Sequence, residues 1–125
     1  MQTRGRVLIV EDDAAILRFF ERSLRAEHDV FTAPDGEEAL ALVRSGQRYD
    51  LILCDLQMPN MTGVDFLMNI DEVAIEQVSR IVFLSANPKQ PMAQLLGGHV
   101  VMDKGASLEH IADFATQMVK QWAAA

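Results

Sequence analysis

The 125-residue sequence has a single cysteine, Cys54, and no block of consecutive lysines and arginines. One cysteine excludes an intramolecular disulfide and fits a reducing compartment. The formal net charge is −7, and without clustered basic residues the chain lacks the phosphate contacts that nucleic-acid binding needs. No apolar run reaches transmembrane length, and residues 1–6 do not have the pattern of a signal peptide. We therefore expect a cytoplasmic protein that binds neither nucleic acid nor membranes directly.

Repeats and low-complexity segments are also missing. Half of the residues are hydrophobic and 23% are charged, as in an ordinary globular protein. The length suits one domain with its own hydrophobic core. We expect a single domain over residues 1–125 with a core of about 5–122. The alanines at its end are compatible with a natural terminus, a linker or a boundary within a longer protein.

Five short apolar runs divide the chain, and each is bounded by turn-forming residues. Such runs are typical of strands that are buried on both faces of a sheet. The runs are Val7–Val10, Asp29–Thr32, Leu51–Cys54, Ile81–Leu84 and Val100–Met102.

Helical patterns separate these runs. Asp13 is a predicted N-cap for the first helix, and Ser107 is a predicted N-cap for the last. The first expected helix ends near Leu24, the second covers Glu37–Arg44, and the third runs from Val64 to near Glu72. A short fourth helix is expected between Pro88 and Gly98, and the last covers Leu108–Trp122. Five strands that alternate with five helices predict an α/β fold, a (βα)5 doubly wound parallel sheet with right-handed crossovers.

Polar side chains follow four of the five predicted strands. They are Glu11, Asp12, Asp55, Ser85 and Lys104. In an open parallel sheet these positions share one edge, where ligands bind. Three carboxylates in one crevice repel each other unless a cation lies among them, and oxygen ligands suit Mg²⁺.

This set of groups also suits phosphoryl chemistry. A metal ion, the Lys104 ammonium and the Ser85 hydroxyl can together neutralise the oxygens of a phosphoryl group. Asp55 is then the natural nucleophile, which would form an aspartyl phosphate. The alternative, in which these charges only cap helices and pair with each other, fits each residue alone better than it fits the whole set.

Four segments carry a resemblance to a known family. They are Val7–Asp12, Asp55–Gly63, Phe83–Ala86 and Lys104. With them the chain resembles the receiver domains of two-component response regulators, whose fold is that of the chemotaxis regulators. The resemblance implies a flavodoxin-like sheet with strand order 2-1-3-4-5. It also implies a signalling phosphoacceptor rather than an enzyme, although such a domain assists its own phosphoryl transfer and dephosphorylation.

The resemblance assigns partners as well. Asp55 would take its phosphoryl group from a histidine kinase or a phosphotransfer protein. The domain would then switch conformation to control a downstream protein or a fused effector domain, and a homodimer is a further option.

The resemblance also assigns the metal site and two positions that tune it. Asp12, Asp55 and the backbone carbonyl of Gln57 would hold Mg²⁺, with Glu11 acting mainly through water. Gln57 and Asn87 match variable positions that set how fast the phosphate is lost. Both are uncharged amides, so neither is an obvious base for the attacking water.

Four further groups would contact the phosphoryl group itself. By resemblance, Ser85 would bond it and shift on activation, and Lys104 would contact its oxygens. The backbone N–H groups of Leu56 and Ala86 would complete the phosphoryl-binding site.

Three features depart from the family pattern. Lys104 is followed by Gly105 instead of proline, and a cis peptide there would cost about 2.5–4 kcal/mol, so we expect a trans peptide or a reshaped loop. Val101 occupies a position that is often aromatic, which excludes an aromatic swing on activation. Ser85 lies only 19 positions before Lys104, and with two prolines and two glycines between them the fourth helix should be short or irregular.

The remaining candidates have simpler interpretations. Cys54 is predicted to be a core residue rather than a redox sensor. His28, His99 and His110 have no metal-ligand spacing, which favours surface or packing roles. Met58, Met61 and Met68 are expected to fill the gap between loop and helix more than to form a partner surface. Trp122 is expected to be packed or half-buried on the last helix.

Two alternatives to the phosphoacceptor remain open. The first is a degenerate receiver that binds proteins without being phosphorylated, which the altered Lys104–Gly105 segment motivates. The second is a phosphohydrolase of the haloacid-dehalogenase type. That family needs an aspartate two positions after the nucleophile, and Gln57 at that position argues against it.

Overall fold

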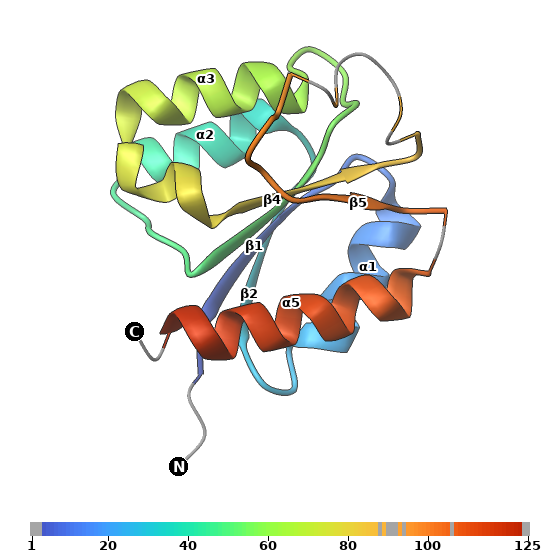
Figure 1. The fold of residues 1–125 in the computed structure, drawn as a ribbon. Coiled ribbons are helices and arrows are strands. Elements are labelled where there is room, and N and C mark those ends of the chain that lie inside the picture. Colours follow the sequence, from blue (N-terminus) through green and yellow to red (C-terminus); the bar gives the residue numbers. More distant parts are fainter. Residues whose placement is uncertain (1–3, 88, 90–92, 94, 106, 124–125) are drawn as a thin grey trace.

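The computed structural model describes residues 4–87, 89, 93, 95–105 and 107–123 (Figure 1). These residues form a five-stranded parallel sheet in the order β2-β1-β3-β4-β5, which confirms the predicted doubly wound, flavodoxin-like fold. The strands are β1 (Arg6–Val10), β2 (Asp29–Ala33), β3 (Leu51–Asp55), β4 (Ile81–Ser85) and β5 (Val101–Asp103).

Helices cover both faces of the sheet. The described helices are α1 (Ala14–Leu24), α2 (Gly36–Arg44), α3 (Gly63–Val73), the 3₁₀-helix η1 (Ile75–Arg80) and α5 (Leu108–Ala123). Helices α1 and α5 lie on one face, and α2 and α3 lie on the other (Figure 1). The short helix predicted between Pro88 and Gly98 falls largely outside the described residues. Among the described helices, none has both the length and the apolar character needed to cross a membrane.

Side-chain caps begin the helices where the sequence predicts them. Asp13 accepts hydrogen bonds from the backbone N–H groups of the first turn of α1, and Ser107 Oγ accepts one from His110 N at 3.2 Å. At α3, Thr62 and Asp65 form a reciprocal capping box, which starts that helix directly after the loop that follows β3. These caps satisfy N–H groups that have no partner within the helix.

The core is divided by the sheet into two layers because side chains alternate along each strand. On β1, Val7 and Ile9 pack toward α1 and α5, whereas Leu8 and Val10 pack toward α2 and α3. Phe20 anchors the first layer and Phe66 anchors the second, and both are fully buried. Each such side chain contributes about 1.5–3 kcal/mol by leaving water.

Two elements differ from the sequence-based prediction. Strand β5 begins at Val101 rather than Val100, which is 44% exposed at the edge of the sheet. Helix η1 was not predicted at all. It is fastened by the buried side chain of Gln77, which accepts a hydrogen bond from Tyr49 N at 2.8 Å and donates one to Tyr49 O at 3.1 Å. A contact between segments so far apart in the chain leaves no periodic signal.

The histidines have the surface or packing roles that the sequence predicts, and the cysteine is the predicted core residue. Cys54 is buried in β3, and His28 is buried where β1 begins, its Nδ1 accepting a hydrogen bond from Gly5 N at 3.4 Å. His99 packs edge-on against Phe83, with the two ring centroids 5.6 Å apart. His110 is exposed on α5.

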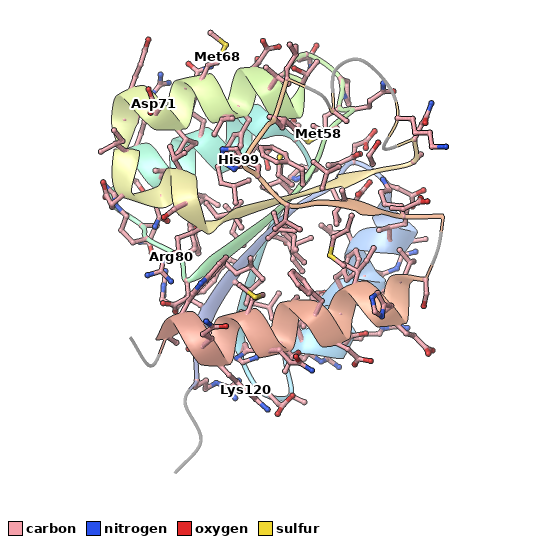
Figure 2. All side chains as sticks on the ribbon, in the orientation of Figure 1. Met58, Met68, Asp71, Arg80, His99 and Lys120 are labelled. Atoms are coloured by element: carbon pink, nitrogen blue, oxygen red, sulfur yellow. The ribbon has the colours of Figure 1, made fainter. Side chains whose placement is uncertain are left out.

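Methionine and tryptophan positions match the prediction in part. Met58 is buried and Met61 packs against the same core layer, so both fill the gap between the loop after β3 and its neighbours. Met68 does not: it projects from the outer side of α3 and is 64% exposed (Figure 2). Trp122 is half-buried, with the Arg80 guanidinium 5.3 Å from its ring centroid.

Candidate functional site

The sheet order brings four polar strand ends to one edge. Strand β3 lies between β1 and β4, so Asp55 at its end is flanked by the residues that follow β1 and by Ser85 at the end of β4. Glu11 follows directly after β1, and Lys104 follows directly after β5. The predicted convergence of these side chains at the carboxyl edge is therefore confirmed.

Three carboxylates and one ammonium group meet there. Glu11, Asp12 and Asp55 each offer a carboxylate oxygen, and these oxygens lie within 4.8 Å of one another. Lys104 Nζ lies 3.1 Å from Glu11 Oε2 and 3.4 Å from Asp55 Oδ2. The Glu11 and Asp55 side chains are buried, whereas Asp12 is exposed at the mouth of the site.

Burial and mutual repulsion shift the ionisation of these groups. Burial, together with the nearby Asp55 charge, raises the pKa of Glu11 to about 7. Burial also raises the pKa of Asp55, and Lys104 opposes that shift. For Lys104, burial works to lower the pKa, but the charges of Asp55 and Glu11 outweigh it and the pKa is raised. The site therefore holds more negative charge than its single ammonium group neutralises.

The donor set fits a divalent metal ion. All three clustered side chains offer hard oxygen ligands, and they include neither sulfur nor imidazole. Burial, and after it the nearby Asp55 charge, raises the pKa of Glu11, so both act against a charged Glu11 carboxylate. An added cation would offset the repulsion between the carboxylates, so the residues present are compatible with a divalent metal site of the Mg²⁺ type.

In the loop after β3, one N–H group that is predicted to contact the phosphoryl group already has a partner in the sheet. The N–H of Leu56 donates to Leu84 O at 2.9 Å and is thus held in the sheet. The N–H that faces the carboxylate is that of Gln57, which donates to Asp55 Oδ1 at 3.3 Å. The contact between the Leu56 N–H and a phosphoryl group stays a prediction, and Gln57 N is a second N–H close to the carboxylate.

Ser85 and Asn87 lie on the β4 side of Asp55, opposite to Glu11 and Asp12 on the β1 side. Ser85 is buried, and its Oγ accepts a hydrogen bond from Asn87 N at 3.0 Å. Its carbonyl accepts one from Lys104 N at 2.9 Å, which ties the β4 end to the β5 end. A pocket opens over this region, lined by Asp55, Gln57, Ala86, Asn87 and Lys104. It contains the carboxylate, the ammonium group and both amide side chains that the sequence singles out.

Gly105 and Val101, the two positions near Lys104 that depart from the family pattern, do not displace the lysine from the site. The peptide between Lys104 and Gly105 is trans, as expected. Asp103 Oδ1 accepts a hydrogen bond from Gly105 N at 2.8 Å, which turns the chain directly after the lysine. Val101 is half-buried against the core layer of α2 and α3. The lysine thus reaches Asp55 although the segment after it differs from the family pattern.

Sequence reasoning missed the positioning roles of two residues, one in the loop after β3 and one at the start of α3. Gly63 N donates to Leu56 O at 2.8 Å, and a Cβ atom on Gly63 would lie 3.0 Å from Leu56 Cα. Asn60 has a φ of 70°, a left-handed conformation that asparagine tolerates better than most residues. The Pro59-Asn60 dipeptide and the glycine were visible turn signals, but the close approach of Gly63 to the strand end was not.

The chain matches the family model described as the response regulator receiver domain over residues 7–110. It is 33% identical over 107 residues to the uncharacterized transcriptional regulatory protein YrkP of Bacillus subtilis (strain 168), covering 85% of this chain and 46% of that one. It is 35% identical over 94 residues to the cell cycle transcriptional regulator CtrA of Caulobacter vibrioides (strain NA1000 / CB15N), covering 74% and 40%. The chain thus spans less than half the length of these curated relatives.

Comparison with solved structures supports the same receiver fold. The chemotaxis response regulator CheY4 of Vibrio cholerae superposes with a TM-score of 0.78 at 28% sequence identity, covering 93% of this chain and 99% of that one. Similarity extends to a different type of whole protein: the sensor histidine kinase TmoS of Ectopseudomonas mendocina is 36% identical over 98 residues, which are 78% of this chain and 10% of the kinase.

Proposed function

This chain belongs to the family of response regulator receiver domains, and from that premise we propose that it is a phosphoacceptor whose site is Asp55. The phosphoryl donor would be a phosphohistidine on a histidine kinase or a phosphotransfer protein. The family places the chain among the signalling modules of two-component systems.

One observation carries the proposal. The Asp55 carboxylate lies at the floor of a pocket with Gln57 N on one oxygen and Lys104 Nζ on the other. These two contacts orient the carboxylate, and the pocket that it lines gives a phosphoryl donor a path to the attacking oxygen. Glu11 is fully buried and contacts the same lysine, so it is less able to reach a phosphoryl donor.

The transfer follows from these contacts. An Asp55 carboxylate oxygen attacks the phosphorus of the phosphohistidine, a P–O bond forms and the P–N bond breaks. The electron pair of that bond returns to the imidazole nitrogen of the donor, which then takes up a proton. The Lys104 ammonium, the N–H groups of Gln57 and Ala86, and the Ser85 hydroxyl would neutralise the phosphoryl oxygens.

The three clustered carboxylates would bind a divalent ion at the same time. Asp12 and Asp55, with the backbone carbonyl of Gln57, would hold Mg²⁺, and Glu11 would support it through water. When bound, the ion supplies positive charge that offsets the repulsion between the carboxylates and the incoming phosphoryl group.

The product would be an acyl phosphate that lasts until water attacks it. Gln57 and Asn87 line the pocket and would set the access of that water. Phosphorylation would shift the domain between two conformations by making different contacts in each, with Ser85 as the group that moves. The controlled partner would be a downstream protein or an effector domain in the same protein.

The test is the intact mass of the protein after incubation with acetyl phosphate and Mg²⁺. We expect a single phosphoryl adduct on the wild type and on Asp71→Asn, which alters an exposed carboxylate of α3. The adduct should be lost in Asp55→Asn and when a chelator removes the metal ion. If the folded wild type takes up no phosphate, the chain is instead a receiver that binds proteins without phosphorylation.

A further inference from the structure

Lys104 is held at the site through the backbone on both sides of it. Its N–H donates to Ser85 O at 2.9 Å, which fastens the peptide before the lysine to the end of β4. The N–H of Gly105 donates to Asp103 Oδ1 at 2.8 Å, which fastens the peptide after the lysine. Because each peptide unit is planar, these two contacts together set the backbone conformation of Lys104.

The backbone conformation of Lys104 decides where its ammonium group lies. The Nζ atom is at the end of a flexible four-carbon stem, so a small rotation at Cα displaces it further. In the structure Nζ lies 3.1 Å from Glu11 Oε2 and 3.4 Å from Asp55 Oδ2, and the lysine side chain is only 14% exposed. A contact that fixes the backbone of Lys104 therefore also acts on the charge beside Asp55.

Glycine at position 105 makes this contact both necessary and possible. A proline there would restrict the backbone of Lys104 by its own ring, whereas glycine imposes no such restriction and is itself free to rotate. A Cβ atom on Gly105 would lie 3.1 Å from Asp103 Oδ1, which is closer than an ordinary contact. The missing side chain thus lets the carboxylate approach the Gly105 N–H, and the carboxylate limits the freedom that glycine brings.

The Asp103 carboxylate does not compete for the ammonium group. Lys104 Nζ pairs with Glu11 and Asp55, and among the described residues no ion pair involves Asp103. Asp103 is exposed at the end of β5, where it pairs in register with Ser85. Its carboxylate therefore serves the turn of the backbone after the strand.

We propose that Asp103 is a positioning residue, which keeps the Lys104 ammonium at the Asp55 carboxylate by accepting the hydrogen bond from Gly105 N. Its part in phosphoryl transfer rests on the proposed function of Asp55, whereas its effect on the position of Lys104 does not. In a turn of this kind the side-chain oxygen takes the place of a backbone carbonyl. The acceptor oxygen is then required and the negative charge is not, so asparagine should replace Asp103 and alanine should not.

Chemical labelling of the lysines tests the position of Lys104 without any phosphoryl transfer. Acetic anhydride acetylates accessible amines, and mass spectrometry of the peptides gives the rate at each lysine. We expect Asp103→Ala to raise the labelling rate of Lys104 at least about threefold, because an amine that leaves its carboxylate partners is more exposed and more often neutral. Asp103→Asn should keep the wild-type rate.

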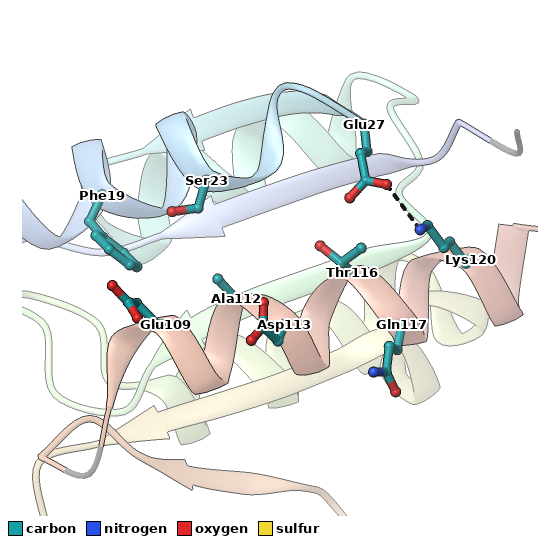
Figure 3. A pocket seen from close by; sticks show the side chains of 9 residues that line it. All are labelled: Phe19, Ser23, Glu27, Glu109, Ala112, Asp113, Thr116, Gln117 and Lys120. Atoms are coloured by element: carbon teal, nitrogen blue, oxygen red, sulfur yellow. Dashed lines mark ion pairs between the residues drawn. The ribbon is translucent and has the colours of Figure 1, made fainter.

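Lys120 is the internal reference for this labelling. It lies in the last turn of α5, is 48% exposed and pairs with Glu27 at 2.9 Å (Figure 3). Its labelling rate should be the same in every variant. Asp71→Ala removes an exposed carboxylate of α3 and is the matched control, which should leave the labelling of Lys104 unchanged.

The rate of phosphoryl uptake shows whether this position matters for the transfer. With acetyl phosphate and Mg²⁺, Asp103→Ala should slow uptake at Asp55 about tenfold, and Asp103→Asn should keep the wild-type rate. In a Lys104→Ala background, Asp103→Ala should cause no further loss, because an effect that passes through the lysine needs the lysine. A merely structural role of Asp103 would slow uptake in both backgrounds.

The two measurements separate this inference from the proposed function. If the wild type takes up no phosphate, the proposed function fails, and the labelling of Lys104 still decides the role of Asp103. Equal labelling of Lys104 in the wild type and in Asp103→Ala overturns the inference, as does an increase in Asp103→Asn that equals the increase in Asp103→Ala. Asp103→Leu, which keeps the bulk but has no acceptor, is the second variant and should match Asp103→Ala, with circular dichroism confirming that each is folded.

Discussion

Glu11 has a fully buried side chain that lies beside the Asp55 carboxylate and the Lys104 ammonium. Its pKa rises from an ordinary value of 4.5 to about 7 on folding, chiefly because of burial. Between these two pH values the unfolded chain releases the Glu11 proton while the folded chain keeps it. The free energy of unfolding therefore falls as pH rises through this window, and the raised pKa of Asp55 acts in the same direction.

The first prediction tests this sign. Without divalent ions, Glu11→Gln should gain stability relative to the wild type as pH rises from about 4.5 to 7, by no more than about 1.4 kcal/mol per pH unit. Urea unfolding at a series of pH values measures the difference. Glu72→Gln, an exposed residue of α3, makes the same charge change and should keep the pH dependence of the wild type. Parallel curves for the wild type and Glu11→Gln would contradict the burial argument.

Gly63 is the second residue whose environment sets a clear expectation. A Cβ atom there would lie 3.0 Å from Leu56 Cα and 3.1 Å from Asp55 O, and backbone atoms cannot move aside as a flexible side chain can. Gly63→Ala should therefore lower the free energy of unfolding by about 1–3 kcal/mol and slow the phosphorylation of Asp55.

The control for Gly63 is another glycine. Gly97 has open space around its Cβ position, so Gly97→Ala should change stability by no more than about 0.5 kcal/mol. Urea unfolding and the rate of phosphoryl uptake are measured for both variants. If the two variants are equally stable, the loop after β3 accommodates a Cβ atom at Gly63 without a loss in the free energy of unfolding.

At the scale of elements, η1 depends on one side chain. Gln77 is 4% exposed and bonds both backbone groups of Tyr49 at the entrance to β3. The strand that carries Asp55 is thereby joined to the helix that precedes β4. Removal of the amide leaves a buried N–H and a buried C=O without partners.

The third prediction follows from these two bonds. Gln77→Ala should lower the free energy of unfolding by about 2–4 kcal/mol. Ser79→Ala, at an exposed position of the same helix, should change it by less than about 0.5 kcal/mol. Denaturant unfolding followed by circular dichroism gives both values. A loss in Gln77→Ala no larger than that in Ser79→Ala would mean that η1 is held by its other contacts.

Whether the sequence predicts a helix cap or a strand boundary depends on whether the contacts that fix it are local in the chain. Asp13 and Ser107 cap their helices through contacts that lie within three residues, so local sequence reveals them. The start of β5 at Val101 depends on its register with β4, where Val101 pairs with Phe83. Local sequence has no access to that register, which accounts for the one-residue error.

At the scale of the whole molecule, a divalent ion should couple the site to global stability. A ligand that binds only the folded state raises the free energy of unfolding by an amount set by its concentration and affinity. The site joins the ends of β1 and β3, which are adjacent in the sheet, so the binding energy acts on the whole fold.

The fourth prediction is that Mg²⁺ stabilises the wild type by about 1–3 kcal/mol at concentrations of about 10 to 100 times its dissociation constant. The gain should be lost in Asp55→Asn and kept in Asp71→Asn. Thermal unfolding with Mg²⁺ and with a chelator measures it. If the two curves of the wild type coincide, the three carboxylates do not form a metal site.

Local signals in the sequence are enough to predict the fold class and most of the candidate site. Continuous apolar runs such as Leu51–Cys54 and the helical pattern of α5 are local signals, and parallel strands must place their carboxyl ends together. The same reasoning predicts that Asp55, Glu11 and Lys104 lie at one edge of the sheet.

Features that depend on exact distances between remote segments are visible in the folded structure alone. It showed that Gln57 N rather than Leu56 N faces Asp55, that Gln77 fastens η1 to β3, and that Gly63 lies against the strand end. Hydrogen-bond direction and close packing arise from segments that meet only after folding, so no pattern along the chain records them.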